Sequence, residues 1–536
     1  MFHYVRHSKA GVSPVPHGTL SRVCMPTLAA VAGAATVLGF APFYLYPLPV
    51  ATLALLIVLW QRATSRRHAA AIGFAFGLGF FLAGVSWVYV SLHDFGAMPA
   101  PLAAVLTLLF CSILAAYPAA IGYLYCALGT RSTYSTLIVL PALWTLADWV
   151  RGWLFTGFPW LAFGYAQVPA SPLAGYAPVT GVYGLTFFTV ISAGLLVTLW
   201  TGWQDARGRI GAAGVTGKGY FSFILHPSSF ILIALWAGGY LLQQIAWTAP
   251  TGALLSVSLL QGNIPQEMKW RPDKISATLD TYRNLVSKSN AHLVVLPETA
   301  LPLFLHEVPQ DYLAALAAHA RSNGGDVLIG VPERTDARGY YNSVLSLGTA
   351  PTQTYRKSHL VPFGEFVPLK PVFGWFFAVT QIPLLDFARG EDTQQPLAVA
   401  GQRVAVDICY EDAFGAEIIR QLPQATLLVN VSNVAWFGRS VAPQQHLQIS
   451  QARALETGRY MLRATNTGMT AIIDQRGKVS KVAPEFSTAV VNGEVQGFAG
   501  ATPYVRWGDM PIVLLALMLA LGGGWLARHG NSKISH

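Results

Sequence analysis

Long apolar runs fill the first half of the chain and return in its last thirty residues. Eight of these runs are long enough, or nearly long enough, to cross the hydrocarbon core of a bilayer as helices. They lie at residues 27–43, 47–61, 70–91, 102–127, 134–149, 176–201, 226–247 and 510–527. This pattern predicts a multi-pass α-helical membrane domain of about eight spans, with both termini on the same side.

The segment from about 248 to 508 shows a different pattern, in which short apolar runs of strand length alternate with amphipathic stretches. Strands are expected at 256–260, 292–296, 327–330, 341–347, 403–409, 426–431, 469–474 and 487–492. Helices are expected at 273–289, 310–321, 413–421 and 442–458. Such alternation predicts an α/β layered domain. The expected division is a membrane domain over 1–247, this α/β domain over 248–508, and a last span with a short tail over 509–536.

Composition and charge support this division and add an orientation. Of the 536 residues, 53% are apolar and only 11% are charged, whereas a soluble domain carries about 25% charged residues. Short loops on one side of the expected membrane hold Arg6, Lys9, Arg22, Arg62, Arg66, Arg67, Arg131, Arg207, Arg209, Lys218, Arg528 and Lys533. The short loops on the other side hold only Arg151. Because Lys and Arg concentrate in cytoplasmic loops, we expect cytoplasmic termini and an external α/β domain.

An irregular aromatic segment, residues 153–165 (WLFTGFPWLAFGY), lies between the fifth and sixth expected spans. Gly157 and Pro159 interrupt it, so it cannot cross lipid as a regular helix. One interpretation is an aromatic belt at the membrane interface. The other is a loop that dips into the membrane surface beside a lipid-binding site.

Cys409 is the one cysteine of the chain that lies in the polar 248–508 segment. It ends an expected strand and precedes the acidic turn Tyr410-Glu411-Asp412. A thiol at the mouth of a strand, among ionisable groups, is suited to nucleophilic chemistry, although a lone cysteine is often only a small core residue. No disulfide can form within the segment, and a free thiol in an oxidising compartment favours a functional role.

Two further strand ends carry ionisable residues. Glu298 follows a buried strand in the stretch LPETALP. Lys357 and Glu365 flank a loop that contains proline and glycine, in the stretch YRKSHLVPFGEFVP. Because the carboxyl ends of strands in an α/β sheet meet at one edge, we expect Glu298, Lys357 and Cys409 to converge.

The order Glu298, Lys357, Cys409, within LPETALP, YRKSHLVPFGEFVP and DICYED, resembles the catalytic triad of the nitrilase superfamily. With its membrane frame, the chain resembles one branch of that superfamily, the apolipoprotein N-acyltransferase family. The likeness extends to the stretches QGNIPQEMKW, FTGFPWLAFGYAQ, VSNVAWFG, QHLQ and RALETGRYMLRATNTG. The resemblance implies that the α/β domain is a nitrilase-like αββα sandwich.

The resemblance also implies a role for each residue. Cys409 would be the nucleophile, Glu298 the proton acceptor, and Lys357 the group that stabilises the oxyanion, helped by a backbone N–H near Tyr410. Glu365 would support the lysine, with a solvated loop residue as the alternative. Tyr410 and Glu411 would support the cysteine loop.

Aromatic residues and one departure from the family pattern complete the expected site. Trp270, Trp436 and Phe437 are candidates to line an acyl-chain entrance, although aromatic residues are more often ordinary packing. Val434 stands where the family usually has an aspartate, so a hydrogen bond that orders this loop is missing or supplied elsewhere. His359 and His446 lack the spacing of metal ligands, and neither a metal nor another cofactor is expected.

The function implied by the resemblance is acyl transfer in two steps. A membrane phospholipid would acylate Cys409, and the α-amine of a diacylglyceryl-cysteine at the N-terminus of an apolipoprotein would then accept the chain. The enzyme would reside in the bacterial inner membrane with a periplasmic catalytic domain, and nucleic acid is not an expected partner. Two alternatives are a membrane-tethered nitrilase or amidase that acts on a small C–N substrate, and a catalytically silent membrane scaffold.

Overall fold

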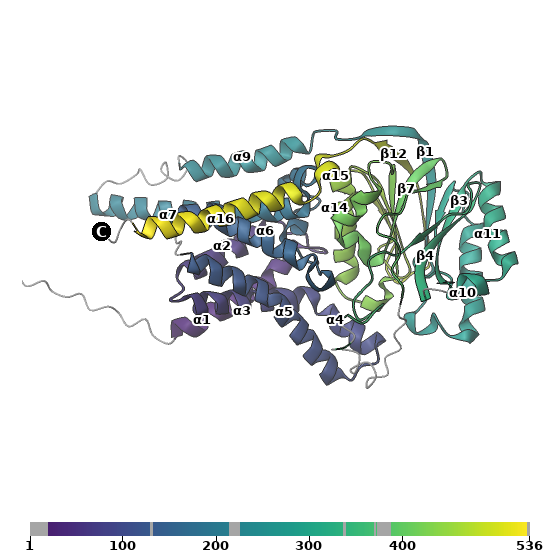
Figure 1. Ribbon diagram of the computed structural model, residues 1–536, viewed down its shortest axis with the longest axis horizontal. Helices are drawn as coiled ribbons and strands as arrows, with labels where there is room; N and C mark the ends of the chain where they lie inside the picture. The colour runs from purple at the N-terminus through teal and green to yellow at the C-terminus, as the bar shows by residue number, and fades with distance from the viewer. Residues whose placement is uncertain are drawn as a thin grey trace, which may run out of the picture.

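Two parts of different architecture lie end to end along the long axis of the molecule (Figure 1). A helical part forms one end and a two-sheet sandwich forms the other, with helix α14 (Ala442–Thr457) on the side of the sandwich that faces the helical part. The computed structural model describes residues 20–128, 132–213, 226–335, 339–368, 371 and 387–532. Of the basic residues used for orientation, Arg6, Lys9, Arg131, Lys218 and Lys533 lie outside these described residues.

The sandwich contains two six-stranded sheets. The first has the order β12-β1-β2-β3-β4-β5 and the second the order β11-β10-β9-β8-β7-β6. The strands of the first are β1 (Ala249–Gln261), β2 (Leu293–Val295), β3 (Asp326–Thr335), β4 (Gly339–Gly348), β5 (Thr354–Arg356) and β12 (Ala489–Ala499). Those of the second are β6 (Leu397–Val399), β7 (Gln402–Ile408), β8 (Leu427–Ser432), β9 (Met461–Thr465), β10 (Ala471–Ile473) and β11 (Val479–Val482).

Three apolar layers hold the sandwich together, because the central strands are covered on both faces. Residues from both sheets, such as Val295 and Val429, form the layer between them. Helices α10 (Pro272–Ser287) and α11 (Gln310–Ser322) pack on the outer face of the first sheet. Helix α14 and the short helix α13 (Gly415–Ile418) pack on the second. The expected αββα sandwich is therefore confirmed.

The helical part consists of apolar helices of unequal length. They are α1 (Leu20–Thr36), α2 (Pro47–Gln61), α3 (Arg66–Val85), α5 (Ala100–Ala127), α6 (Leu140–Arg151), α7 (Ala177–Ala213), α9 (Pro227–Leu242) and α16 (Met510–Ser532). Among the described residues, three helical stretches, Arg66–Val85, Ala100–Ala127 and Pro172–Asp205, are long and apolar enough to cross a membrane by length and composition. Four others are apolar but shorter. The count of eight spans stays a prediction.

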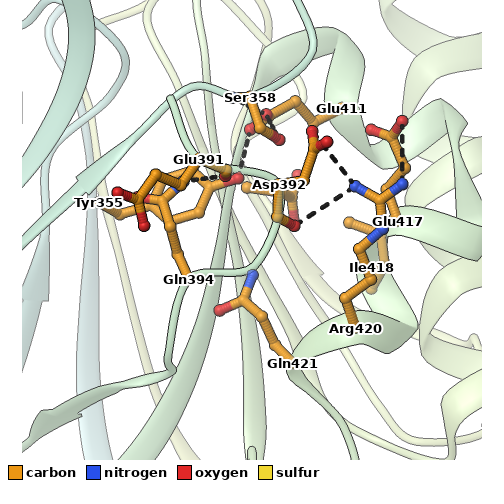
Figure 2. A pocket seen from close by; sticks show the side chains of 11 residues that line it. Tyr355, Ser358, Glu391, Asp392, Gln394, Glu411, Glu417, Ile418, Arg420 and Gln421 are labelled. Carbon is orange, nitrogen blue, oxygen red and sulfur yellow. Dashed lines mark hydrogen bonds and ion pairs between the residues drawn. The ribbon is translucent and has the colours of Figure 1, made fainter. Parts of the chain in front are cut away.

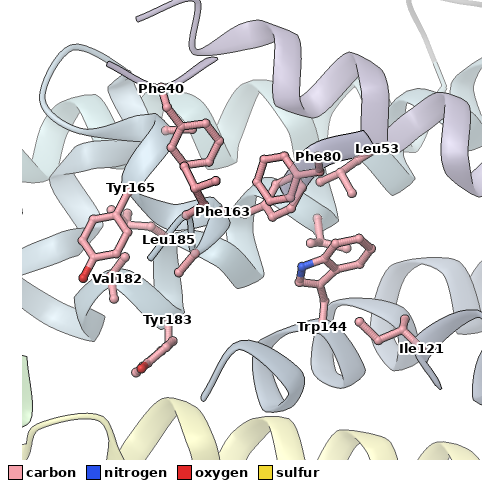
Figure 3. Close-up of a cluster of buried hydrophobic side chains, with 14 of the residues drawn as sticks. Phe40, Leu53, Phe80, Ile121, Trp144, Phe163, Tyr165, Val182, Tyr183 and Leu185 are labelled. Atoms are coloured by element: carbon pink, nitrogen blue, oxygen red, sulfur yellow. The ribbon is translucent and has the colours of Figure 1, made fainter. Parts of the chain in front are cut away.

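Aromatic packing joins the irregular segment 153–165 to the helical part. The Phe163 ring lies 5.0 Å from Trp144, 5.2 Å from Phe80 and 6.5 Å from Phe40, measured between ring centres. Figure 3 shows these four side chains together inside the helical part. The C-terminal half of the segment is therefore an internal element of the protein. Its N-terminal half differs, since Trp153 and Phe155 are 52% and 74% exposed.

Several expected element bounds need correction. The first helix begins at Leu20 and its α-helical turns end at Thr36, whereas 27–43 was expected. The expected helix 413–421 is a set of short turns, in which only Gly415–Ile418 is α-helical. Four short strands were not predicted, namely β5, β6, β9 and β11. Strands of three to five residues give too few positions for an alternating pattern to emerge.

Candidate active site

Cys409 lies directly after strand β7, at a sharp turn of the backbone. Its φ angle is +57°, in the left-handed region that a residue with a side chain seldom occupies. The turn continues as a 3-10 helix over Cys409–Ala413. The thiol is partly buried. Strained turns of this kind after a strand present a nucleophile at the edge of a sheet.

Glu298 follows strand β2 of the other sheet and is buried, with 6% exposure. Its two carboxylate oxygens have different partners. Asn342 Nδ2 donates to Oε1 at 2.7 Å, and the backbone N–H of Asn433 donates to Oε2 at 2.7 Å. Asn342 is on β4 and Asn433 follows β8, so both sheets hold this carboxylate in place.

Lys357 follows strand β5, and its backbone N–H continues the pairing with β4 by donating to the Asn342 carbonyl at 2.8 Å. The side chain is 1% exposed. Its Nζ lies 2.8 Å from Glu365 Oε1 and 3.6 Å from Glu298 Oε1. One ammonium group therefore joins two carboxylates. We refer to Glu298, Lys357 and Glu365 as the front cluster.

Burial and charge set the protonation states of these groups. Burial raises the pKa of Cys409 to about 12, Glu298 adds to this rise, and Lys357 opposes it. Burial also raises the pKa of Glu298, but Lys357, Lys269 and hydrogen bonds from Asn342 and Asn433 together bring it below its ordinary value. Burial lowers the pKa of Lys357, and its two carboxylate neighbours raise it to a net value above the ordinary one. The resting site thus pairs a neutral thiol with an ionised carboxylate and an ammonium ion.

Glu411 fastens the cysteine turn to the strand that carries the lysine. One carboxylate oxygen accepts from the backbone N–H groups of Ser358 and His359, at 2.6 and 3.0 Å. The other accepts from the Ile408 backbone N–H at 2.7 Å and the Tyr355 hydroxyl at 3.0 Å. These bonds connect the residues that flank Lys357 with the residues that flank Cys409.

A small pocket lies beside Glu411, lined by side chains from 355–358, 391–394 and 407–421 (Figure 2). Its volume is about 10 Å³, which accommodates about one water molecule. An acyl chain cannot fit there, so this pocket is not the place where a lipid would react. Within the described ranges, no group of three or more His, Cys, Asp or Glu side chains is arranged to hold a metal ion.

A second set of buried charges supports Cys409 from its backbone side. Asp412 lies 2.7 Å from His446 Nε2 and 3.1 Å from Arg463 Nη1, and it accepts a hydrogen bond from Ser450 at 2.6 Å. His446 Nε2 also lies 3.1 Å from the Cys409 carbonyl oxygen. We refer to Asp412, His446 and Arg463 as the rear cluster.

Comparison with known proteins adds an independent line of evidence. A family model described as the apolipoprotein N-acyltransferase N-terminal domain matches residues 32–195, and one described as carbon-nitrogen hydrolase matches residues 256–504. The apolipoprotein N-acyltransferase of Nitrosomonas europaea is 55% identical over 94% of this chain and 97% of its own length. The chain belongs to the apolipoprotein N-acyltransferase family. The relative of the same name from Chromobacterium violaceum is 45% identical over 96% of this chain and 97% of its own length.

In this member of the family, the aromatic segment of the helical part reaches the cysteine turn. The Tyr410 hydroxyl donates to the Gly157 carbonyl at 3.1 Å, and the Tyr165 hydroxyl donates to the Ala413 carbonyl at 3.3 Å. The Trp160 ring stacks on Tyr410 with 6.5 Å between ring centres. Segment 153–165 is therefore part of the surroundings of the site, a contact between distant parts of the chain that sequence patterns do not reveal.

An ion pair inside the helical part fixes the path of this segment. Arg151 Nη2 lies 3.0 Å from Asp148 Oδ1, and both residues are buried. Arg151 Nη1 also donates to the carbonyl oxygens of Phe158 and Trp160. Charged residues in an apolar helical region are costly unless they are paired in this way.

The three aromatic candidates for an acyl-chain entrance lie in different surroundings. Trp270 and Trp436 are 43% and 42% exposed. Phe437 packs against Trp87, with 4.7 Å between ring centres, and against Trp160. Two of the three candidates therefore present apolar surface, while the third packs against helical-part residues.

The loop that contains Val434 is ordered by the helical part. Val434 is 1% exposed, and the Trp436 carbonyl two residues later accepts a hydrogen bond from Ser91 at 2.8 Å. The Phe95 and Trp436 rings also meet, with 6.3 Å between their centres. These contacts give the loop an attachment that does not depend on an aspartate at position 434.

Three residues at the site were not singled out from the sequence. Asn342 and Asn433 hold the Glu298 carboxylate, and Lys269 is 2% exposed with its Nζ 3.2 Å from the Glu298 carbonyl oxygen. Asn342 lies in the middle of a strand, where nothing in the pattern marks it. Lys269 does carry a signal, since it lies in QGNIPQEMKW, one of the stretches that define the resemblance.

Proposed function

We propose that this chain is an apolipoprotein N-acyltransferase that carries its acyl group on Cys409. The observation that supports this most directly is the buried front cluster within electrostatic range of a partly accessible thiol. A thiol, a carboxylate and an ammonium group are the components that acyl transfer through a thioester requires. The acyl donor is a membrane phospholipid, and the acceptor is a lipoprotein whose N-terminal cysteine carries a diacylglyceryl group.

In the first step, Cys409 attacks the ester carbonyl carbon of the phospholipid. The S–H proton passes to the Glu298 carboxylate as the S–C bond forms, so the thiol needs no prior ionisation despite its raised pKa. Lys357 and the Tyr410 backbone N–H stabilise the oxyanion. The C–O bond then breaks, Glu298 returns the proton to the departing alkoxide, and a lysophospholipid leaves.

In the second step, the α-amine of the acceptor attacks the thioester. Glu298 accepts a proton from the amine, the C–S bond breaks, and Cys409 regains its proton. Glu365 keeps Lys357 oriented through their 2.8 Å contact. Glu411 keeps the cysteine turn and the lysine strand in register, and Trp270, Trp436 and Phe437 guide the acyl chain.

The topology that serves this reaction has eight spans, formed by α1, α2, α3, α5, α6, α7, α9 and α16. Residues 1–247 form the membrane domain, 248–508 the catalytic domain, and 509–536 the last span and tail. The bias of Lys and Arg toward one set of loops supports cytoplasmic termini and a periplasmic catalytic domain. A thiol on that side of the bacterial inner membrane would meet both lipid substrates at the membrane surface.

The test uses the full-length protein in detergent or nanodiscs with phosphatidylethanolamine vesicles as acyl donor. Intact-mass spectrometry should detect an adduct of one acyl chain that hydroxylamine removes and that Cys409→Ala abolishes. Addition of a synthetic diacylglyceryl-cysteine peptide should discharge the adduct and yield the N-acylated peptide. Absence of any adduct from pH 6 to 8 would refute the proposal. A small-amide hydrolase would instead release ammonia from an amide without lipid.

A further inference from the structure

Lys269 is a buried cation of the site to which the proposed mechanism gives no role. It follows the 3-10 turn Gln266–Met268, and its side chain is 2% exposed. Its neighbours differ sharply, since Met268 and Trp270 are 38% and 43% exposed. The segment therefore turns one charged side chain inward while it presents apolar side chains on either side of it.

The Lys269 ammonium group contacts the backbone of Glu298, whose side chain is the proposed proton acceptor. Its Nζ donates to the Glu298 carbonyl oxygen at 3.2 Å. The Lys269 segment is joined to the same residue by a second route, because Asn433 Nδ2 donates to Gln266 Oε1 at 2.8 Å while the Asn433 backbone N–H donates to Glu298 Oε2. Asn433 thus connects the segment that carries Lys269 with the Glu298 carboxylate.

Buried ammonium groups are costly, so an unexplained one near a reacting carboxylate calls for a function. Burial lowers the pKa of Lys269, and the neighbouring Glu298 and Cys409 oppose this, so that the net pKa is about 8. The group is therefore mostly charged at pH 7. Of the other charges at the site, Lys357 and Glu365 pair with each other, and Glu267 on the Lys269 segment is exposed.

We infer that Lys269 is a positioning residue of the catalytic centre, whose ammonium fixes the Glu298 backbone and favours the carboxylate form of its side chain. Without this cation, Lys357 and the hydrogen bonds from Asn342 and Asn433 would oppose burial alone, so the pKa of Glu298 would rise, and a protonated Glu298 cannot accept the Cys409 proton. Lys357 is already engaged with Glu365 at 2.8 Å, closer than its 3.6 Å contact with Glu298. A second cation therefore has a distinct task. The inference rests on the proposed role of Glu298.

The experiment measures how fast iodoacetamide alkylates Cys409 from pH 3 to 8, followed by peptide-resolved mass spectrometry on the full-length protein. Alkylation forms an S–C bond, releases iodide and transfers the thiol proton to Glu298. The alkylation rate therefore falls at low pH as Glu298 becomes protonated, and this acidic limb of the pH–rate profile reports the protonation of Glu298. In Lys269→Met the midpoint of this limb should move up by about one to two pH units, the usual effect of losing a nearby opposite charge. Lys269→Arg keeps the charge and should restore the wild-type midpoint.

Lys274→Met is the matched control, because Lys274 is 44% exposed on the following helix, and its profile should coincide with that of the wild type. If Lys269→Met does not fold, Lys269→Gln provides the same neutral test with a hydrogen-bond donor retained. A neutral variant that folds and keeps the wild-type midpoint overturns the inference. A midpoint in Lys269→Arg that equals that of the neutral variant also overturns it, because the charge would then have no effect. Loss of the lipid adduct in the wild type would refute the proposed function alone, since alkylation needs no lipid.

Discussion

The front and rear clusters differ in what their charges can still do. Each contains buried ionisable groups within a few ångströms of one another. The front cluster places a carboxylate and an ammonium group within electrostatic range of the Cys409 thiol. The direct contact of the rear cluster with Cys409 is to its backbone carbonyl, from His446, although Arg463 also lies within electrostatic range of the thiol. In the proposed mechanism, burial therefore serves proton transfer in the front cluster, whereas in the rear cluster it stabilises the backbone of the cysteine turn.

The distance from each carboxylate to its cationic partner explains this difference between the clusters. The rear carboxylate, Asp412, has contacts of 2.6 to 3.1 Å with Ser450, His446 and Arg463. The Arg463 contact compensates the charge of Asp412 directly, whereas the 2.7 Å hydrogen bonds to Glu298 come from neutral donors, Asn342 and the Asn433 backbone. In the front cluster, Lys357 is 3.6 Å from Glu298, too long for a strong hydrogen bond. Glu298 is thus charged but incompletely paired with its lysine, as a proton acceptor should be.

The largest expected effect comes from Glu298→Gln in the front cluster. The amide keeps the size of the side chain but cannot accept the thiol proton, so the rate of acyl-enzyme formation should fall by about 10²–10⁴-fold. Single-turnover intact-mass kinetics with phospholipid measures it. Glu267→Gln, an exposed site on a nearby segment, is the control and should react as the wild type does. Normal turnover by Glu298→Gln would remove this residue from the acceptor role.

Asp412→Asn in the rear cluster should act on stability instead. The change leaves Arg463, which is fully buried, without its carboxylate, and breaking a buried ion pair costs about 3–5 kcal/mol. The thermal midpoint of the protein in detergent should drop by several degrees, while the pH profile of Cys409 alkylation keeps its midpoint.

Asp392→Asn is the matched control for this change. Its ion pair with Arg389 is exposed, and exposed pairs contribute little to stability, so the thermal midpoint should hardly move. If Asp412→Asn shifts the acidic limb of alkylation at unchanged stability, the proposed division between the two clusters is wrong.

The sequence predicts the front cluster far better than the rear one. Glu298, Lys357 and Cys409 lie at strand ends, and the structure brings Glu298 and Lys357 to 3.6 Å and Cys409 within electrostatic range of both. Arg463 lies within β9, a strand that was not predicted, and His446 lies on a helix that is buried almost throughout. A helix covered on all sides has no polar face, so its pattern does not mark a functional residue.

The fold shows the same limit of prediction from sequence patterns. Alternating patterns predict the α/β layered domain, and the family resemblance adds the αββα sandwich. The contact between segment 153–165 and the cysteine turn, in contrast, joins residues about 250 positions apart. Local periodicity carries no information on such a pair. The contact depends on how the helical part docks against α14, where Trp160 donates to Gln445 at 2.7 Å.

His446 gives the rear cluster a dependence on pH that begins near neutrality, where an unperturbed histidine titrates. Burial and Arg463 lower the pKa of His446, and Asp412 only partly opposes them. The unfolded chain binds a proton near pH 6.5, whereas the folded protein does so only at lower pH. This stabilising contribution is therefore complete above pH 6.5 and lost as the pH falls, by at most about 1.4 kcal/mol per unit. In His446→Gln the thermal midpoint should fall less steeply from pH 7 to 5. Parallel slopes in the two proteins would contradict the assignment.

Tyr410→Phe should have the smallest effect and tests whether the helical part shapes the front of the turn. The change removes the 3.1 Å hydrogen bond from the Tyr410 hydroxyl to the Gly157 carbonyl but keeps the ring that stacks on Trp160. A neutral hydrogen bond contributes about 1 kcal/mol, so we expect acyl-enzyme formation to slow by about fivefold at most. Tyr240→Phe, at an exposed tyrosine of α9, is the control. Because the bond reaches the turn from the helical part, the loss should appear with phospholipid and be absent from iodoacetamide alkylation. An equal loss in both assays would mean that the hydroxyl supports the cysteine turn itself, as the rear cluster does.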